Sequence, residues 1–216
     1  MIVEIELTLV SIIQGVALAV LIENARGVTN ASQLEFWPYV LAGLLTICVF
    51  WSRAILHIIT VIRWPLEFGH NFLYLGCALI EAISFSQLAK PVNWFAFGAA
   101  FIAIGWLLFV YDLRLIHARH RDSAGPETDK LLALVLRDQR LNIALLLPIV
   151  FLLDVACAAA IHFWPRSFLA ANGHLWLIAA QLAGFSGYLA YVVHFYGKLA
   201  PLIANAREEW HRNQAS

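Results

Sequence analysis

The sequence predicts an all-α integral membrane protein, a single domain of residues 1–216 folded as a polytopic bundle of six transmembrane helices. Hydrophobic residues make up 62% of the chain and charged residues only 13%, whereas soluble domains contain about half and about a quarter. The hydrophobic residues also form long blocks, each near the roughly 20 residues that cross a bilayer as a helix. The formal net charge is zero, so we expect the lipid bilayer, and no nucleic acid, as a partner.

The hydrophobic blocks follow one another with short connections between most of them. They run over residues 2–22, 36–62, 68–88, 94–116, 141–164 and 174–197. Turn signals such as Trp64-Pro65 and Trp164-Pro165 separate them. The first block begins with acidic residues, where a signal peptide would carry basic ones, so we expect it to be retained as a helix.

The connection over residues 117–140 is the longest and most polar one, and we expect it in the cytoplasm. Leucine and valine alternate with charged residues over 127–139, which is typical of an amphipathic helix. This helix would either lie on the membrane surface or extend the fifth transmembrane helix, because nothing breaks the helical pattern before Pro148. Residues 201–216 are expected to form a short polar tail.

Basic residues predict the orientation of the bundle. If the N-terminus is cytoplasmic, the outer loops carry only Arg26, Lys90 and Arg166. The cytoplasmic side then carries Arg63, Arg114, Arg119, Arg121, Lys130, Arg137, Arg140, Lys198, Arg207 and Arg212. This excess predicts that both termini are cytoplasmic. We expect a multi-pass protein of the plasma membrane, or of the inner membrane if the protein is bacterial.

A shift of 100 residues along the chain aligns several identical residues. Trp64-Pro65 aligns with Trp164-Pro165, and Phe85-Ser86 aligns with Phe185-Ser186. If these identities reflect a true repeat, residues 1–90 and 91–200 form two inverted three-helix repeats, an arrangement in which many transporters bind their substrate between the repeats. The alternative is chance identity in a chain of biased composition.

The third block carries an ionisable residue well inside it. On a helix, Glu81 shares one face with His70, Tyr74, Cys77 and Ser84, because these residues are three or four positions apart. A charged side chain at the centre of a bilayer costs about 2.5–3.5 kcal/mol on insertion scales, so it persists where it faces a partner, water or protein. We therefore expect this face to line a functional interior, with Glu81 and Tyr74 as binding or relay groups.

Further polar residues inside the blocks complete the predicted site. They are Asp154 and Gln181 near the membrane midplane, and Arg53, His57 and Asp112 in the cytoplasmic half. We expect Arg53 to pair with Asp154 or Glu81, because a buried charge requires a partner. The other carboxylate would then be available to bind and release protons. The alternative is that these groups only hold the helices together by hydrogen bonds.

Histidines provide the weak candidates for a cofactor site. His57, His70 and His194 lie toward the cytoplasmic ends of their blocks, and two imidazoles at equal depth on facing helices could bind haem iron. Haem is the minor hypothesis, and we predict no cofactor, metal site or catalytic residue. The sequence contains neither the HExxH pattern of metalloproteases nor the GxSxG pattern of serine hydrolases.

The leading functional prediction is a small membrane transporter or channel for a proton, an inorganic ion or a small solute, in preference to an enzyme. One alternative is a haem-binding or other redox or enzymatic membrane subunit. Another is a non-catalytic scaffold that binds partner helices. A bundle of six helices encloses a pathway more readily when it assembles with further copies or other subunits, so we expect a homo-oligomer or a membrane complex.

Overall fold

The described chain is almost entirely helical. The computed structural model describes residues 2–60, 68–121 and 125–215. Its α-helices are α1 (Ile2–Asn30), α2 (Trp37–Thr60), α3 (Phe68–Phe85), α4 (Pro91–Arg121), α5 (Pro126–Leu141), α6 (Leu147–Phe163) and α7 (His174–Ala215). The short helical segments are η1 (Leu34–Phe36), η2 (Asn142–Leu146) and η3 (Arg166–Ala170). These three ranges contain no strand, so the predicted all-α class is confirmed.

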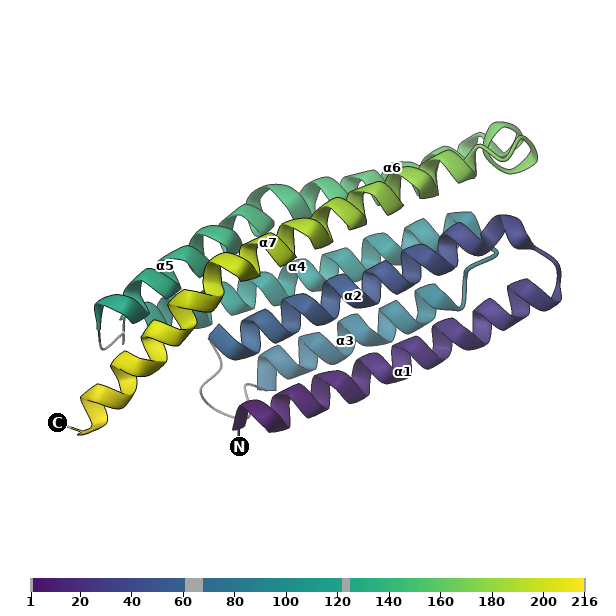
Figure 1. The fold of residues 1–216 in the computed structure, drawn as a ribbon. Helices are drawn as coiled ribbons and strands as arrows, with labels where there is room; N and C mark the ends of the chain where they lie inside the picture. The colour runs from purple at the N-terminus through teal and green to yellow at the C-terminus, as the bar shows by residue number, and fades with distance from the viewer. Residues whose placement is uncertain (1, 61–67, 122–124, 216) are drawn as a thin grey trace.

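Within the described residues, six helical stretches are long and apolar enough to cross a membrane, as predicted. They are Glu4–Asn30, Leu34–Thr60, Phe68–Phe85, Pro91–Arg121, Pro126–Phe163 and His174–Glu209. The helices lie alongside one another, and both chain termini lie at one end of the bundle (Figure 1). We call this the termini end. We call the opposite end, where α6 turns into α7, the hairpin end.

Large apolar side chains stay exposed along the outside of the bundle. Ile12 of α1, Leu79 of α3 and Leu152 of α6 are each more than half exposed. In water such a continuous apolar surface would promote association, whereas in a bilayer it contacts lipid tails. The exposed faces are therefore compatible with a multi-pass membrane protein. The identity of the membrane, the side on which the termini lie and the inverted repeat stay predictions.

The polar connection before the fifth block is helical and continuous with it. Helix α5 passes through η2 into α6, so 126–163 form one helical stretch of 38 residues. Of the two predicted alternatives, the structure therefore has the extended fifth helix. Leu131 and Val135 of α5 are buried in one apolar cluster with Ile116 of α4 and Leu199 of α7. This packing, against two neighbouring helices, holds α5 on the bundle.

A π-helical segment joins α5 to α6 just before Pro148. Pro148 has no backbone N–H, so it cannot bond the carbonyl four residues earlier, and a regular helix would be interrupted there. The wider turns of η2, residues 142–146, absorb this defect. Asn142, the first residue of η2, is fully buried and turns its side chain toward the bundle interior. The π segment thus places a polar residue inside the bundle.

The C-terminal residues continue α7 past the predicted end of the sixth span. Helix α7 runs through Pro201 to Ala215, so most of the predicted tail belongs to it. Near its end, the Glu209 carboxylate accepts hydrogen bonds from the backbone N–H groups of Glu127 and Thr128 at 3.4 and 3.0 Å. These are donors at the start of α5, which have no partner within their own helix. The end of α7 therefore caps α5.

The packing order leaves an interior space between four helices. Helix α1 packs against α2 and α3, and α3 packs against α4. Helix α6 packs mainly on α4, whereas α7 packs on α2 and α5. The consecutive helices α6 and α7 therefore rest on different partners. Helices α2, α4, α6 and α7 surround a cavity that forms part of the candidate site.

Candidate functional site

All seven residues predicted to bind or relay a substrate line one of three neighbouring cavities. A cavity of about 20 Å³ touches Arg53, His57, Tyr74 and Asp112. A cavity of about 30 Å³ touches Glu81, Asp154 and Gln181. A larger cavity, of about 650 Å³, touches Arg53, Asp154 and Gln181. Because Asp154, Gln181 and Arg53 each line two cavities, the large cavity adjoins both small ones.

The polar face predicted for the third block is buried along the whole of α3. His70, Tyr74, Cys77, Glu81 and Ser84 are all at most 7% exposed. Gln14 of α1 reaches this face, although it was not among the predicted site residues. Its Nε2 donates to the Tyr74 hydroxyl at 3.2 Å and to Oε2 of Glu81 at 3.3 Å. Gln14 thereby fixes the position of the Glu81 carboxylate.

Glu81 and Asp154 come from different helices but line the same 30 Å³ cavity. The two carboxylates are 1% and 4% exposed as residues. Asp154 Oδ1 accepts a hydrogen bond from Gln181 Nε2 at 3.0 Å, and Gln181 Oε1 accepts one from the Trp94 indole at 2.9 Å. The second oxygens, Oε1 of Glu81 and Oδ2 of Asp154, have no hydrogen-bond partner among the described residues. Each acid thus retains one oxygen able to accept a proton, a water or a cation.

The predicted partner of Arg53 is wrong. Its Nη2 donates to Oδ2 of Asp138 at 2.7 Å, and it bonds neither Glu81 nor Asp154 in the described structure. The Arg53 guanidinium also lies over the Phe109 ring, 5.1 Å from its centroid. Asp138 reaches this position because α5 packs on the bundle. Both partners are less than 10% exposed, so their charges compensate each other inside the protein.

Sequence reasoning also missed the groups that hold Asp138. The Tyr191 hydroxyl donates to Asp138 Oδ1 at 2.5 Å, and the Tyr188 hydroxyl donates to Asn142 Oδ1 at 2.5 Å. A signal for Asp138 was present. Leu131, Val135, Asp138 and Asn142 follow steps of four, three and four, which place both polar residues on the apolar face of α5. A charged residue on such a face requires a buried partner.

The 650 Å³ cavity has the size and lining of a ligand-binding site. Its volume of about 650 Å³ falls within the usual range for small-molecule pockets. Apolar side chains from α2, α4, α6 and α7 form most of its wall, among them Phe101, Val150 and Leu177. Its polar groups are concentrated in two places, at Asp154 with Gln181 and at Arg53 with Tyr188 and Tyr191. The cavity therefore connects the level of the Asp154 carboxylate with that of the Arg53–Asp138 pair.

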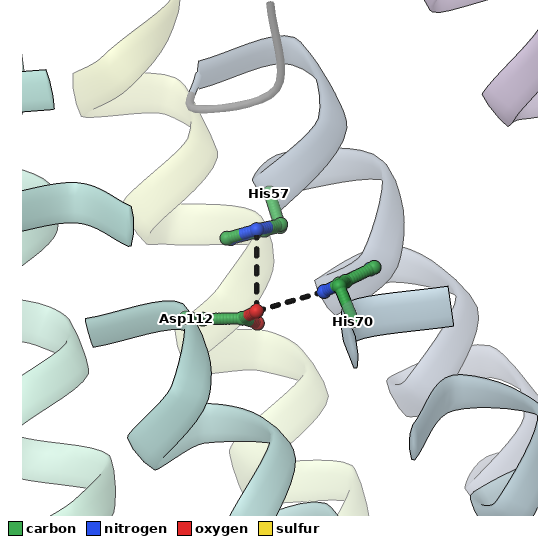
Figure 2. Close-up of side chains that lie close together, drawn as sticks. All are labelled: His57, His70 and Asp112. Carbon is green, nitrogen blue, oxygen red and sulfur yellow. Dashed lines mark hydrogen bonds and ion pairs between the residues drawn. The ribbon is translucent and has the colours of Figure 1, made fainter. Parts of the chain in front are cut away.

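Two histidines and an aspartate from three helices converge beside the smallest cavity. His57 of α2, His70 of α3 and Asp112 of α4 lie side by side (Figure 2). His70 Nδ1 lies 2.7 Å from Asp112 Oδ1 and donates to it, since a carboxylate oxygen only accepts. His57 Nε2 lies 3.5 Å from the same oxygen. One oxygen of Asp112 thus accepts a hydrogen bond from His70 and lies near the His57 ring without a hydrogen bond to it.

The haem candidates do not have the arrangement of an axial ligand pair in this conformation. The His57 and His70 rings stack on each other, with centroids 4.9 Å apart and planes inclined by 11°. Axial histidines bind iron from opposite faces of a porphyrin, so the macrocycle must lie between them. The third candidate, His194 of α7, is exposed.

No protein family, curated protein or solved structure matches the chain. The assignment of a function therefore depends on the site geometry described above.

Proposed function

We propose that this protein is a small membrane transporter or channel in which Glu81 and Asp154 form a relay for protons or small cations. The observation that carries the proposal is the 30 Å³ cavity between them. Both carboxylates line it, and each has one oxygen without a hydrogen-bond partner in the described ranges. Paired intramembrane acids of this kind are typical of proton and ion pathways.

The size of the cavity fits a water-mediated relay. A buried water requires about 10–15 Å³ and two to four polar partners, so the cavity has room for one or two waters. Thr46 and Ser84 also line this cavity and offer hydroxyl groups to such waters. A proton released by one acid would then reach the other through a short chain of hydrogen bonds. A small cation would meet the same oxygens as ligands.

The charge balance supports an exchangeable proton or cation at these acids. Arg53 is compensated by Asp138, and neither Glu81 nor Asp154 has a basic ion-pair partner among residues 2–60, 68–121 and 125–215. An uncompensated carboxylate in an apolar interior gains by binding a proton or a cation. Glu81 and Asp154 can therefore bind and release a proton or a cation, whereas Asp138 is paired with Arg53.

The 650 Å³ cavity provides the second part of the proposed pathway. It touches Asp154 and extends toward Arg53 and Tyr191, which lie nearer the termini end. A small solute held there would contact the Asp154 carboxylate, so that solute binding and proton binding could compete at one residue. We propose that the protein acts as a homo-oligomer or in a membrane complex, as expected for a chain of six membrane-spanning helices.

Proton flux in liposomes tests the relay. Purified protein is reconstituted with a pH-sensitive dye trapped inside, and a potassium diffusion potential drives protons across the membrane. We expect potential-driven acidification with the wild-type protein, and a loss of at least about tenfold in Glu81→Gln and in Asp154→Asn. Both substitutions keep the side-chain shape but remove the exchangeable proton.

Glu23→Gln is the matched control, because Glu23 is a highly exposed acid of α1 that pairs with Arg26, three residues along the same helix. We expect its flux to equal that of the wild type. Thermal unfolding in detergent verifies that each variant is folded. Wild-type flux in folded Glu81→Gln and Asp154→Asn proteins would remove both acids from the pathway and with them the proposal.

A further inference from the structure

We propose that His57, His70 and Asp112 form a binding site for a divalent transition-metal ion of the zinc class. The three side chains come from α2, α3 and α4 and each offers one ligand atom, and these atoms all lie within 4.8 Å of one another (Figure 2). All three residues are less than 10% exposed. The site is distinct from the Glu81–Asp154 relay and does not depend on the proposed transport function.

The distances are close to those that a shared metal ion imposes. Zinc bonds to imidazole nitrogen and carboxylate oxygen are about 2.0–2.2 Å, which places neighbouring ligand atoms of a tetrahedral site about 3.3–3.6 Å apart. His57 Nε2 lies 3.5 Å from Asp112 Oδ1, so this edge already has the required length. His70 Nδ1 lies 2.7 Å from the same oxygen, so these two atoms would move apart by about 0.6–0.9 Å on metal binding. The metal would replace the proton on Nδ1, and the neutral ring would then carry its proton on Nε2.

His57 provides the second observation that indicates a ligand. Its Nε2 is buried and has no hydrogen-bond partner within the described part of the chain, and the residue as a whole is only 8% exposed. Nearly all buried polar side-chain atoms have a partner, so an orphaned nitrogen calls for an explanation. Figure 2 shows this nitrogen directed at the Asp112 carboxylate. A metal ion between the two would satisfy both groups.

Space and charge at the cluster also suit a metal. The 20 Å³ cavity is lined by His57, His70 and Asp112 and has room for one water, which would serve as a fourth ligand. Arg53, which lines the same cavity, is paired with Asp138, so part of its repulsion on a bound cation is offset. Two imidazoles with one carboxylate favour zinc, iron, cobalt, nickel or copper, whereas calcium and magnesium prefer oxygen ligands alone.

Metal titration of the purified full-length protein tests this inference. After chelator treatment, Zn²⁺ is titrated by calorimetry, and Co²⁺ is titrated while its visible ligand-field absorption is recorded. We expect one ion of either metal per chain, and a rise of the thermal unfolding temperature that depends on Zn²⁺ concentration. We expect Mg²⁺ at the same concentration to produce neither effect.

Variants locate the ion. His57→Gln and Asp112→Asn should each weaken Zn²⁺ binding at least about tenfold and change or remove the Co²⁺ spectrum. The matched control is His194→Gln, which removes an exposed histidine of α7 and should bind like the wild type. If His57→Gln does not fold, Asp112→Asn decides the question, because its amide oxygen still accepts from His70. Absence of stoichiometric binding to the wild type, or undiminished binding to the folded variants, would overturn the inference.

The metal test and the transport test fail independently. Zn²⁺ binding is measured in detergent without any flux, and none of its variants alters Glu81 or Asp154. If the protein binds zinc but conducts no protons, the metal-site proposal stands and the relay proposal is overturned. If it conducts protons but binds no zinc, the relay proposal stands and the metal-site proposal is overturned.

Discussion

The position of the Asp154 carboxylate depends on a residue that has no side chain. Gly98 of α4 faces Asp154 of α6, and a methyl group added at Gly98 would lie 2.9 Å from Asp154 Oδ2. The glycine therefore leaves room for the oxygen that has no hydrogen-bond partner among the described residues. At Gly197, an exposed residue of α7 that lines none of the three cavities, an added methyl would have no atom within 4 Å. Alanine substitution at each glycine therefore distinguishes a steric effect on Asp154 from the general effect of replacing a glycine in a helix.

We therefore predict that Gly98→Ala lowers proton flux several-fold, because the added methyl displaces the Asp154 carboxylate from the 30 Å³ cavity. The clash, of about 1–3 kcal/mol, is partly offset by the gain of about 1 kcal/mol for alanine over glycine in a helix. Flux in the liposome assay and thermal unfolding in detergent measure the two effects. Gly197→Ala should keep wild-type flux and be at least as stable. Equal flux in both variants would show that the carboxylate tolerates the displacement.

At the scale of helices, α5 depends on α7 for its first turn. Gly125 precedes α5 and supplies no side-chain cap. The Glu209 carboxylate takes this role from a distant part of the chain, bonding the N–H groups of Glu127 and Thr128 and the Thr128 hydroxyl. A negative charge at a helix N-terminus is also stabilised by the helix dipole. The position of Asp138, and through it of Arg53, follows from the docking of this helix.

We predict that Glu209→Ala destabilises the protein by about 1–2 kcal/mol, the range for a lost N-terminal cap with its dipole interaction. Amide hydrogen exchange should accelerate at Glu127 and Thr128, whose N–H groups lose their acceptor. Its neighbour Glu208 is exposed and serves as the control, so Glu208→Ala should leave both measurements unchanged. Protected amides in Glu209→Ala would mean that packing alone, without the carboxylate, orders the start of α5.

At the scale of the whole molecule, the bundle has two chemically different ends. Both termini lie at one end, together with the start of α5 and the end of α4, where Arg114, Arg119 and Arg121 are found (Figure 1). The hairpin end carries few basic residues, Arg166 among them. Loops rich in lysine and arginine stay in the cytoplasm. The charge difference between the ends therefore predicts which side each end faces.

We predict that the termini end is cytoplasmic. In a protein whose three cysteines are replaced by serine, Ser167→Cys at the hairpin end should react with a membrane-impermeant maleimide in intact cells. Asp129→Cys, an exposed site at the start of α5, should react only after the membrane is permeabilised. The opposite labelling pattern would reverse the predicted orientation while leaving the fold unchanged.

The sequence predicted those features that depend on local periodicity and length. Six apolar blocks gave six membrane-length helices, because the bilayer requires a similar length of each one. Steps of three and four placed His70, Tyr74 and Glu81 on one face of α3, and that face is buried. The sequence could not indicate which helices pack against each other. The predicted partner of Arg53 depended on the expected depth of each residue in the membrane, and it was wrong.

The sequence by itself determined the helical class, the number of membrane-length helices and the buried polar face of α3. Only the tertiary structure decided that Arg53 bonds Asp138, that Glu81 and Asp154 share one cavity, and that His57, His70 and Asp112 meet. The physical reason is that helix periodicity is set by hydrogen bonds a few residues apart, whereas contacts between helices depend on packing across the whole bundle. The sites therefore emerge only when the helices are placed side by side.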